Sequence, residues 1–343
     1  MEHLEEKIKN AALAAGYEAC GIIKISAMSG FERKLTERMA LIPAANFFYQ
    51  NYRGFAHLEE SYPWAKAIVV CVRNDGKYIV PDGLEGVIGK SYLFDSRTNP
   101  MAPGYLNSVR FETCLKDFGL DAVTERKFGI TALRWAASEA GLGLVRKNNF
   151  FYTDSGSRVS LEAWLIDYEL EAIVKPTVKP CPEGCSLCMK HCLTSSLSQA
   201  YTMNPLSCVS FQTTFGDLSA TRERLGTQIG NWVYGCDVCQ DVCPFNKHVR
   251  TATEEFPGLA ELSQQISLEK LVAADYSFLE KTLQPKFWYI RQNDVWKWKV
   301  NAINAMVNNY SDKYRECILN ARNDAQPKVW EMAQWAAGKL GLS

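Results

Sequence analysis

Two cysteine-rich stretches decide the fold of this chain: "CPEGCSLCMKHCL" at residues 181–193 and "GCDVCQDVCPFN" at residues 235–246. The first holds four cysteines, the second holds three, and Cys208 lies between them. Thiolates two residues apart can bind one metal centre from a single tight turn. A cysteine three residues farther on, followed by proline, points toward a neighbouring centre, as in bacterial ferredoxins. The spacing therefore predicts a bacterial ferredoxin-like domain with two 4Fe–4S clusters.

Eight cysteines are the number that two such clusters need. We predict that one cluster is bound by Cys181, Cys185, Cys188 and Cys243, and the other by Cys192, Cys208, Cys236 and Cys239. The gap after Cys181 is one residue longer than in ferredoxins, so Cys181 departs most from the pattern. Two four-thiolate zinc sites are the alternative, although zinc ribbons usually pair two CxxC knuckles. The remaining cysteines lie in apolar or helical stretches and are expected in the core: Cys20, Cys71, Cys114 and Cys317.

Composition indicates a globular protein without a strong charge preference. The chain has 343 residues, is 47% hydrophobic, and carries 38 basic against 38 acidic side chains, so no global field attracts nucleic acid or anionic membranes. Its first twenty residues read as a charged amphipathic helix rather than a signal peptide, and we expect no membrane partner. We expect a cytoplasmic location, where thiols stay reduced and dense cysteines bind metal rather than form disulfides.

The pattern along the chain predicts an α+β protein in three parts. Residues 1–175 read as an α/β domain, in which the apolar run at 67–72 is typical of a strand buried on both faces. Residues 176–250 are the ferredoxin-like domain. Residues 251–343 are predicted to be helical and to form a cap of HEAT-like helical repeats.

One segment of the helical part, residues 281–299, is both basic and aromatic. It has five basic residues against one acidic, and Lys297 and Lys299 alternate with tryptophans. Basic side chains bind phosphates and aromatic rings stack on bases, so this segment is a candidate tRNA-binding surface. Packing of the aromatic side chains between helices is the alternative.

Several strings of the sequence resemble one family. They are "AGLGLVRKNNFFYTDSGSRVSLEAWLIDYEL" at 140–170, "SCVSFQTT" at 207–214 and "GCDVCQDVCPFN". In this order they resemble epoxyqueuosine reductases, which are cobalamin-dependent enzymes with two 4Fe–4S clusters that complete queuosine synthesis in tRNA and are related to reductive dehalogenases. The resemblance extends over nearly the whole chain.

The resemblance implies a cofactor and its site. The first domain would have a nitroreductase-like α/β fold and bind cobalamin, with Lys147, Asn148, Ser157 and Ser210 at positions that match the family's cofactor-lining residues. Electrons from a small donor, such as a ferredoxin or flavodoxin, would pass through the clusters to the cobalamin, which would reduce the substrate.

The chain also departs from the family. The family's proton-donor aspartate aligns with Lys127, and Arg146 replaces the glycine before Lys147. An ammonium group is a poorer acid at neutral pH than a carboxylic acid. Lys127 is either the donor or a surface lysine, and the side chains that could replace it are Tyr92, Tyr105, Asp121 and Glu125.

Three functions remain open on the sequence alone. The first is a corrinoid-dependent iron–sulfur reductase. The second is an iron–sulfur electron carrier that reactivates a corrinoid protein or another enzyme and needs no proton donor. The third is an RNA-binding module that uses residues 281–299 and holds its clusters for structure.

Overall fold

An antiparallel sheet organises the N-terminal part of the computed structural model, which describes residues 3–247 and 252–343. The strands follow the order β1-β2-β6-β3, and a separate two-stranded hairpin pairs β4 with β5. The bounds are β1 Ala19–Lys24, β2 Ala67–Asn74, β3 Ala122–Val123, β4 Leu144–Val145, β5 Phe151–Tyr152 and β6 Val159–Ile166.

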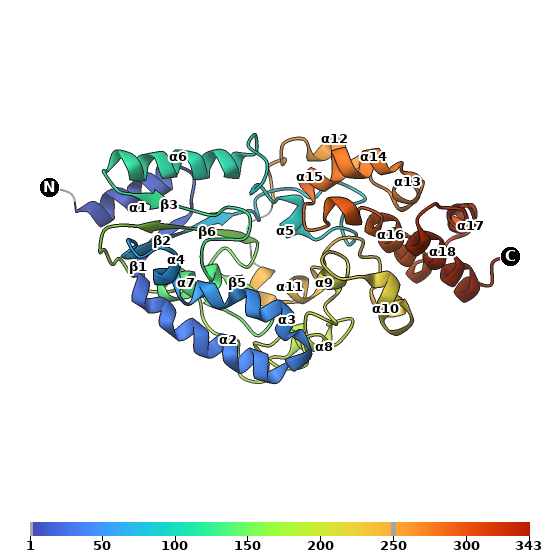
Figure 1. Ribbon diagram of the computed structural model, residues 1–343, viewed down its shortest axis with the longest axis horizontal. Coiled ribbons are helices and arrows are strands. Elements are labelled where there is room, and N and C mark those ends of the chain that lie inside the picture. The colour runs from blue at the N-terminus through green and yellow to red at the C-terminus, as the bar shows by residue number, and fades with distance from the viewer. Residues whose placement is uncertain (1–2, 248–251) are drawn as a thin grey trace.

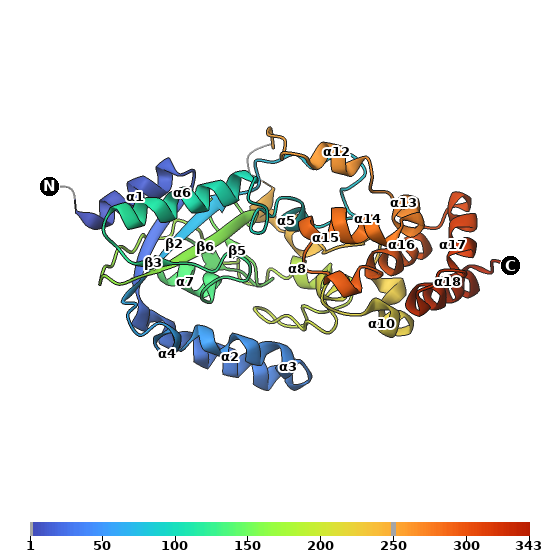
Figure 2. The ribbon, with the colours of Figure 1, turned by 45° about the horizontal axis from the view of Figure 1, so that its top comes forward.

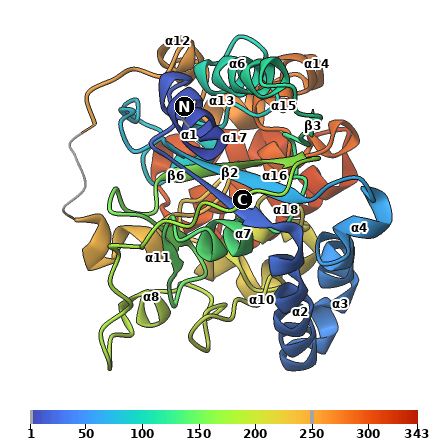
Figure 3. The same ribbon diagram turned by 90° about the vertical axis from the view of Figure 1, so that its left-hand side faces the viewer.

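Helices cover both faces of this sheet, as Figures 1 and 3 show. Helices α1 (Leu4–Ala14) and α6 (Pro103–Asp117) pack on the face formed by Val69, Cys71 and Trp164, and α7 (Leu133–Glu139) packs on the opposite face. Residues 67–72 of the central strand β2 are therefore buried throughout, which confirms the predicted two-sided burial.

The four cysteines outside the predicted cluster ligands lie in the sheet and on helices. Cys20 and Cys71 are buried partners across β1 and β2, as predicted, whereas Cys114 and Cys317 are half-buried on helices.

An arm of short helices leaves the sheet after β1. It consists of α2 (Ser29–Leu41), α3 (Asn46–Tyr49) and α4 (Leu58–Ser61), and Figure 2 shows α2 and α3 lying along one side of the molecule. The arm reaches the cysteine-rich part, because the Tyr49 hydroxyl donates to the Met203 carbonyl at 2.7 Å. This arm was not among the elements predicted from the sequence.

The cysteine-rich part consists of loops and short helices. These are α8 (Leu187–Lys190), α9 (Val209–Gln212), α10 (Leu218–Leu225) and α11 (Val238–Asp241), while α5 (Lys90–Leu93) from the preceding part lies beside them. Helix α10 is followed by a 3-10 turn at Gly226–Gln228.

The C-terminal part is helical, as predicted. Its elements are α12 (Leu259–Ser263), α13 (Leu268–Ala273), α14 (Tyr276–Phe278), a π-helical turn (Leu279–Leu283), α15 (Gln284–Lys286), α16 (Lys297–Asn308), α17 (Arg315–Ala321) and α18 (Pro327–Leu340). Helix α16 packs between α13 and α18, and α17 packs on α18. A HEAT-like repeat pattern stays a prediction.

The three expected parts share apolar packing. One core joins side chains from residues 78–102 to residues of the cysteine-rich part and the C-terminal helices. The expected boundary at 250 lies outside the described residues, and the three-part division stays a prediction. Across the described residues, no helix combines the length and the apolar character that crossing a membrane requires.

Candidate functional site

The predicted cluster cysteines form two spatial groups. The first thiol group, Cys181, Cys185, Cys188 and Cys243, lines one small cavity together with Arg146, Lys147, Asn148, Leu187, Pro244 and Phe245. Burial raises the pKa of the Cys188 thiol, and the nearby thiols of Cys181, Cys243 and Cys185 add to that increase. Residues 55 positions apart, Cys188 and Cys243, thus meet at one cavity because α8 contacts α11.

The second thiol group consists of Cys192, Cys208, Cys236 and Cys239. Burial raises the pKa of Cys239 well above its usual range, and Cys236, Cys208 and Cys192 are the nearby thiols that raise it further. Burial raises the pKa of Cys236 as well, with Cys208 and Cys192 again among the causes. The chain therefore brings together the same two sets of four that the spacing predicted. Their role as ligands stays a prediction.

The donor set fits two iron–sulfur clusters. Among residues 3–247 and 252–343, no three histidine, cysteine or acidic side chains converge as tightly as a single metal ion requires. A 4Fe–4S cluster binds one thiolate at each iron and is wider than one ion, so four separated thiols around a cavity suit it better than a tetrahedral zinc site.

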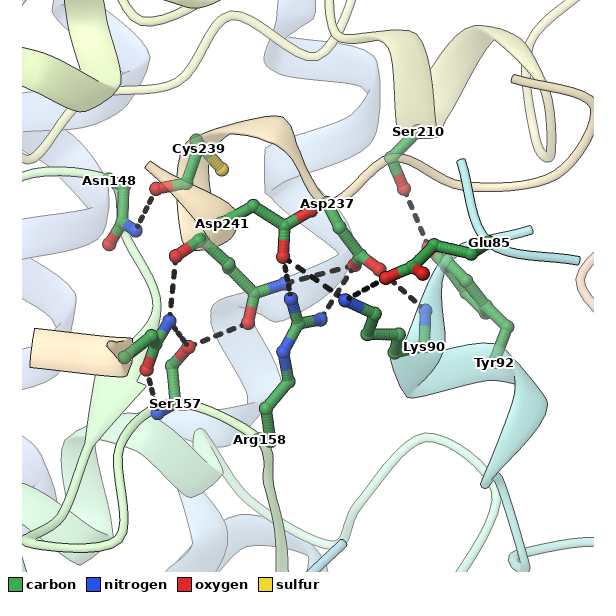
Figure 4. A network of polar contacts seen from close by, with 12 residues as sticks. Glu85, Lys90, Tyr92, Asn148, Ser157, Arg158, Ser210, Asp237, Cys239 and Asp241 are labelled. Atoms are coloured by element: carbon green, nitrogen blue, oxygen red, sulfur yellow. Dashed lines mark hydrogen bonds and ion pairs between the residues drawn. The ribbon is translucent and has the colours of Figure 1, made fainter. Parts of the chain in front are cut away.

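The residues at the expected cofactor-lining positions contact the cysteine segments. The Lys147 ammonium donates to the Cys185 carbonyl at 2.8 Å. The Asn148 amide donates to the Cys239 carbonyl at 3.0 Å (Figure 4). The Ser157 hydroxyl donates to the Gln240 side chain at 2.8 Å. These three side chains thus join the sheet domain to both thiol groups.

Ser210 lies on the other side of the second thiol group. Its hydroxyl is 2.7 Å from that of Tyr92, and it follows Cys208 by two residues at the start of α9. Burial raises the pKa of Tyr92, so this phenol stays protonated at neutral pH. Tyr92 was named as one possible replacement for the proton-donor aspartate that aligns with Lys127. Of those replacements, it is the one that lies beside a predicted cluster ligand, Cys208.

An ion-pair network that the sequence did not reveal holds the second cysteine stretch. Arg158 contacts Asp237 at 3.0 Å and Asp241 at 2.5 Å, and the Lys90 backbone N–H donates to Asp237 at 2.8 Å (Figure 4). Asp237 belongs to the GCDVC string, yet its partners lie about 80 and 150 residues earlier, beyond the reach of local pattern analysis.

Lys127 lies on an exposed loop between β3 and α7. Its ammonium is 5.0 Å from the Trp288 ring centre, and its carbonyl accepts from Arg97 at 3.1 Å. The Glu125 carboxylate accepts the backbone N–H groups of Lys127 and Phe128. Glu125 thus shapes this loop, and Lys127 rests on an aromatic residue of the C-terminal part.

Two other side chains named as replacements serve elsewhere. The Tyr105 ring stacks under the Arg126 guanidinium at 5.4 Å, and Asp121 is an exposed residue at the edge of the sheet. Neither contacts a thiol group among the described contacts.

An aromatic row connects the Lys127 loop to the segment after Cys208. The row consists of Phe128, Trp288, Tyr289, Phe215, Phe211 and Phe48, with successive ring centres 5.2, 4.0, 5.0, 6.2 and 5.4 Å apart. Phe128 and Phe215 are exposed to 59% and 38%. Rings from the sheet domain, the cysteine-rich part and the C-terminal helices thus meet in one line, which is exposed at Phe128 and Phe215 and buried at Trp288.

The basic and aromatic segment 281–299 is only partly available to a ligand. Lys297 and Lys299 are buried and pair with Asp294 at 3.3 Å and Asp324 at 2.9 Å. The expectation that these two lysines contact RNA is therefore corrected, because their charges are taken up inside the protein. Among the basic residues of the segment, Lys281 and Arg291 are exposed.

Comparison with known proteins agrees with the iron–sulfur prediction. Residues 181–246 match the 4Fe-4S double cluster binding domain, which confirms two such clusters as the predicted cofactors of this segment.

The predicted family resemblance is also confirmed. Epoxyqueuosine reductases of Escherichia coli (strain K12) and Bacillus subtilis (strain 168) are 30% and 31% identical over 205 and 219 residues, covering 58% and 61% of this chain. These alignments cover 52% and 53% of the relatives, so the chain spans about half the length of the curated relatives it matches.

A solved structure shares the fold over almost the whole chain. It is an epoxyqueuosine reductase crystallised with a tRNA-Tyr epoxyqueuosine-modified stem loop, with a TM-score of 0.78 at 22% identity, covering 98% of this chain and 90% of that one.

Proposed function

We propose that the chain is an iron–sulfur reductase of the epoxyqueuosine reductase type, in which two 4Fe–4S clusters supply electrons to a cobalamin that reduces a modified tRNA nucleoside. The observation that carries this proposal is the aromatic row. It begins beside the second thiol group and ends at Lys127, the position of the family's proton donor. Electron source and proton source would thus lie at the two ends of one ligand surface.

The residues present fit a large flat cofactor at this surface. The exposed rings of Phe128 and Phe215 give apolar faces for a macrocycle, and the Ser210 and Tyr92 hydroxyls offer polar contacts next to Cys208. In this proposal Lys147, Asn148 and Ser157 act mainly by holding the two thiol groups against the sheet domain. We also propose that the sheet domain has a nitroreductase-like α/β fold.

Lys127 is the proposed proton donor. Its ammonium stands over Trp288 on an exposed loop, and its backbone is held by Glu125 and Arg97, so the side chain is presented from a fixed position. Lys127→Met should lower turnover by roughly tenfold to a hundredfold if the ammonium donates the proton. Lys127→Asp should retain or increase it, because it restores a carboxylic acid.

The test is a reconstituted reaction without oxygen. The full chain is purified anaerobically with cobalamin, reduced, and mixed with a tRNA stem loop that carries epoxyqueuosine, and nucleosides are measured by mass spectrometry. We expect iron near eight per chain, bound cobalt and formation of queuosine. If the protein contains its full iron but neither retains cobalt nor converts epoxyqueuosine, the reductase proposal is excluded. The electron-carrier function then applies, and it agrees with a lysine at position 127 because a carrier needs no proton donor.

The tRNA surface of this proposal includes the exposed part of segment 281–299. Lys281→Glu together with Arg291→Glu should weaken stem-loop binding and flatten its salt dependence, since each lost phosphate contact lowers the slope. Lys313→Glu, an exposed lysine elsewhere on the helical part, is the matched control. If wild type, the double variant and the Lys313→Glu control bind the stem loop with equal affinity at low salt, segment 281–299 is not part of the tRNA-binding surface. A ferredoxin or flavodoxin is the proposed electron donor.

A further inference from the structure

Arg146 is a buried cation at the first thiol group. It follows β4 directly, and 1% of its surface is exposed. One terminal nitrogen lies 3.8 Å from the Cys181 sulfur, and the other donates to the Lys179 carbonyl at 2.6 Å. The guanidinium also lies 3.3 Å from the centre of the Phe245 ring, which fixes its plane beside the cavity.

The charge of Arg146 has no carboxylate partner. Among the ion pairs of the described residues, none includes Arg146, and its Nε is buried without a hydrogen-bond acceptor. A buried charge without a counter-ion is strongly unfavourable, so this guanidinium requires an anion nearby. The first thiol group supplies one when its four cysteines are thiolates around a cluster.

The second thiol group has a different environment. No lysine or arginine side chain hydrogen-bonds the sulfurs of Cys192, Cys208, Cys236 or Cys239 among the described contacts. Arg158, the cation that pairs with the GCDVC segment, has its charge offset by Asp237 and Asp241. One predicted cluster therefore faces an uncompensated positive charge and the other faces a compensated one.

We infer that Arg146 raises the reduction potential of the cluster bound by the first thiol group above that of the second cluster, so that the first cluster is the one reduced first in an equilibrium titration. Reduction adds one electron, taken from an external low-potential carrier, and makes the cluster more negative. A fixed cation beside a ligand sulfur stabilises the more negative state, and charge and hydrogen bonds at the sulfurs are the protein's main means of setting such potentials. This inference rests on the proposed function only in requiring that both clusters are bound.

The experiment is a redox titration of the anaerobically purified full chain, followed by electron paramagnetic resonance, with iron measured on each sample. Removing the charge with Arg146→Gln should lower the reduced-to-oxidised ratio of one cluster by roughly tenfold at a fixed potential, about 59 mV for one electron. Arg146→Lys keeps the charge and should shift that ratio less. Arg315→Gln, which removes an exposed arginine on α17, should shift neither cluster.

Assignment of the signals uses Cys208→Ser, which removes a ligand of the second cluster and leaves the first. Full iron with both potentials unchanged in Arg146→Gln would overturn the inference. If Arg146→Gln fails to keep its iron, the two reduction potentials of the wild-type protein provide the test. The cluster whose signal survives in Cys208→Ser is the first cluster, and it must have the higher of the two potentials. A lower potential for that cluster refutes the inference. Neither readout involves tRNA or cobalamin. The inference can therefore fail while the proposed reductase activity stands, and the reductase activity can fail while the inference stands.

Discussion

Asn301 connects the C-terminal helices to the second thiol group, and its replacement is the sharpest structural test. It lies on α16 with 1% of its surface exposed. Its amide donates to the carbonyls of Thr213 and Val233, both at 2.9 Å. Thr213 follows Cys208 by five residues and Val233 precedes Cys236 by three, so one side chain holds the two segments that bring these cysteines together.

The cost of Asn301→Leu follows from these two bonds. Each carbonyl left buried without its donor costs about 1 to 3 kcal/mol, and the apolar leucine returns part of that by removing a buried amide. We expect a net loss of about 2 to 4 kcal/mol. For a chain of this size such a loss lowers the unfolding midpoint by about 3 to 6 °C.

The assay is thermal unfolding of the iron-loaded protein under anaerobic conditions, with iron release followed in parallel. Asn301→Leu should release iron from the second cluster before the first. Asn308→Leu is the matched control on the same helix, because its amide donates to Gly226 and Asn304, away from the cysteines. A midpoint for Asn301→Leu within about 1 °C of wild type, where the lost bonds predict several degrees, would refute the reasoning.

The remaining predictions concern iron binding and one buried amine. Cys239→Ser should reduce iron to roughly half of about eight per chain, whereas Cys71→Ser in the sheet should leave iron unchanged. Cys181 departs most from the ferredoxin spacing. Iron loss in Cys181→Ser would show that Cys181 is a cluster ligand, and normal iron would show that it is not. Burial lowers the pKa of Lys286 to about 8, so trace acetylation should give it a midpoint there, against the ordinary lysine value of about 10.4. Because the unfolded chain binds that proton more tightly, stability should rise with pH between about 8 and about 10.4, and an ordinary midpoint would contradict the burial of this amine.

Local patterns were sufficient where a residue's environment is set by its near neighbours. The apolar run at 67–72 predicted a central strand, and the end of α18 at Gly341 follows from a residue that adopts the left-handed conformation, with φ of 65°. The cysteine spacing predicted which thiols group together, because a cluster ligand set is restricted by the geometry of short turns.

Contacts between distant segments could not be predicted in the same way. The Arg158–Asp237 pair joins residues 79 positions apart, and nothing in either local sequence indicates the other. Lys297 and Lys299 show the opposite error: a basic and aromatic segment reads as a surface, but Asp294 and Asp324 neutralise both lysines in the interior. Charge counted along the chain does not show which charges remain free after folding.

The polar contacts that hold the thiol groups differ from those that hold the loop of Lys127, the proposed proton donor. The thiol groups are held by Asn148, Arg158 and Asn301, which belong to the sheet domain and to α16 and do not contact the Lys127 loop. That loop is fixed independently by Glu125, Arg97 and Trp288. A change from an acid to a lysine at position 127 therefore alters the chemistry at the end of the aromatic row without loosening the relay. Under the proposed function, the chain would deliver electrons through its clusters and reduce either epoxyqueuosine or a substrate with different proton requirements. The comparison of Lys127→Asp with Lys127→Met on epoxyqueuosine tRNA separates these two cases.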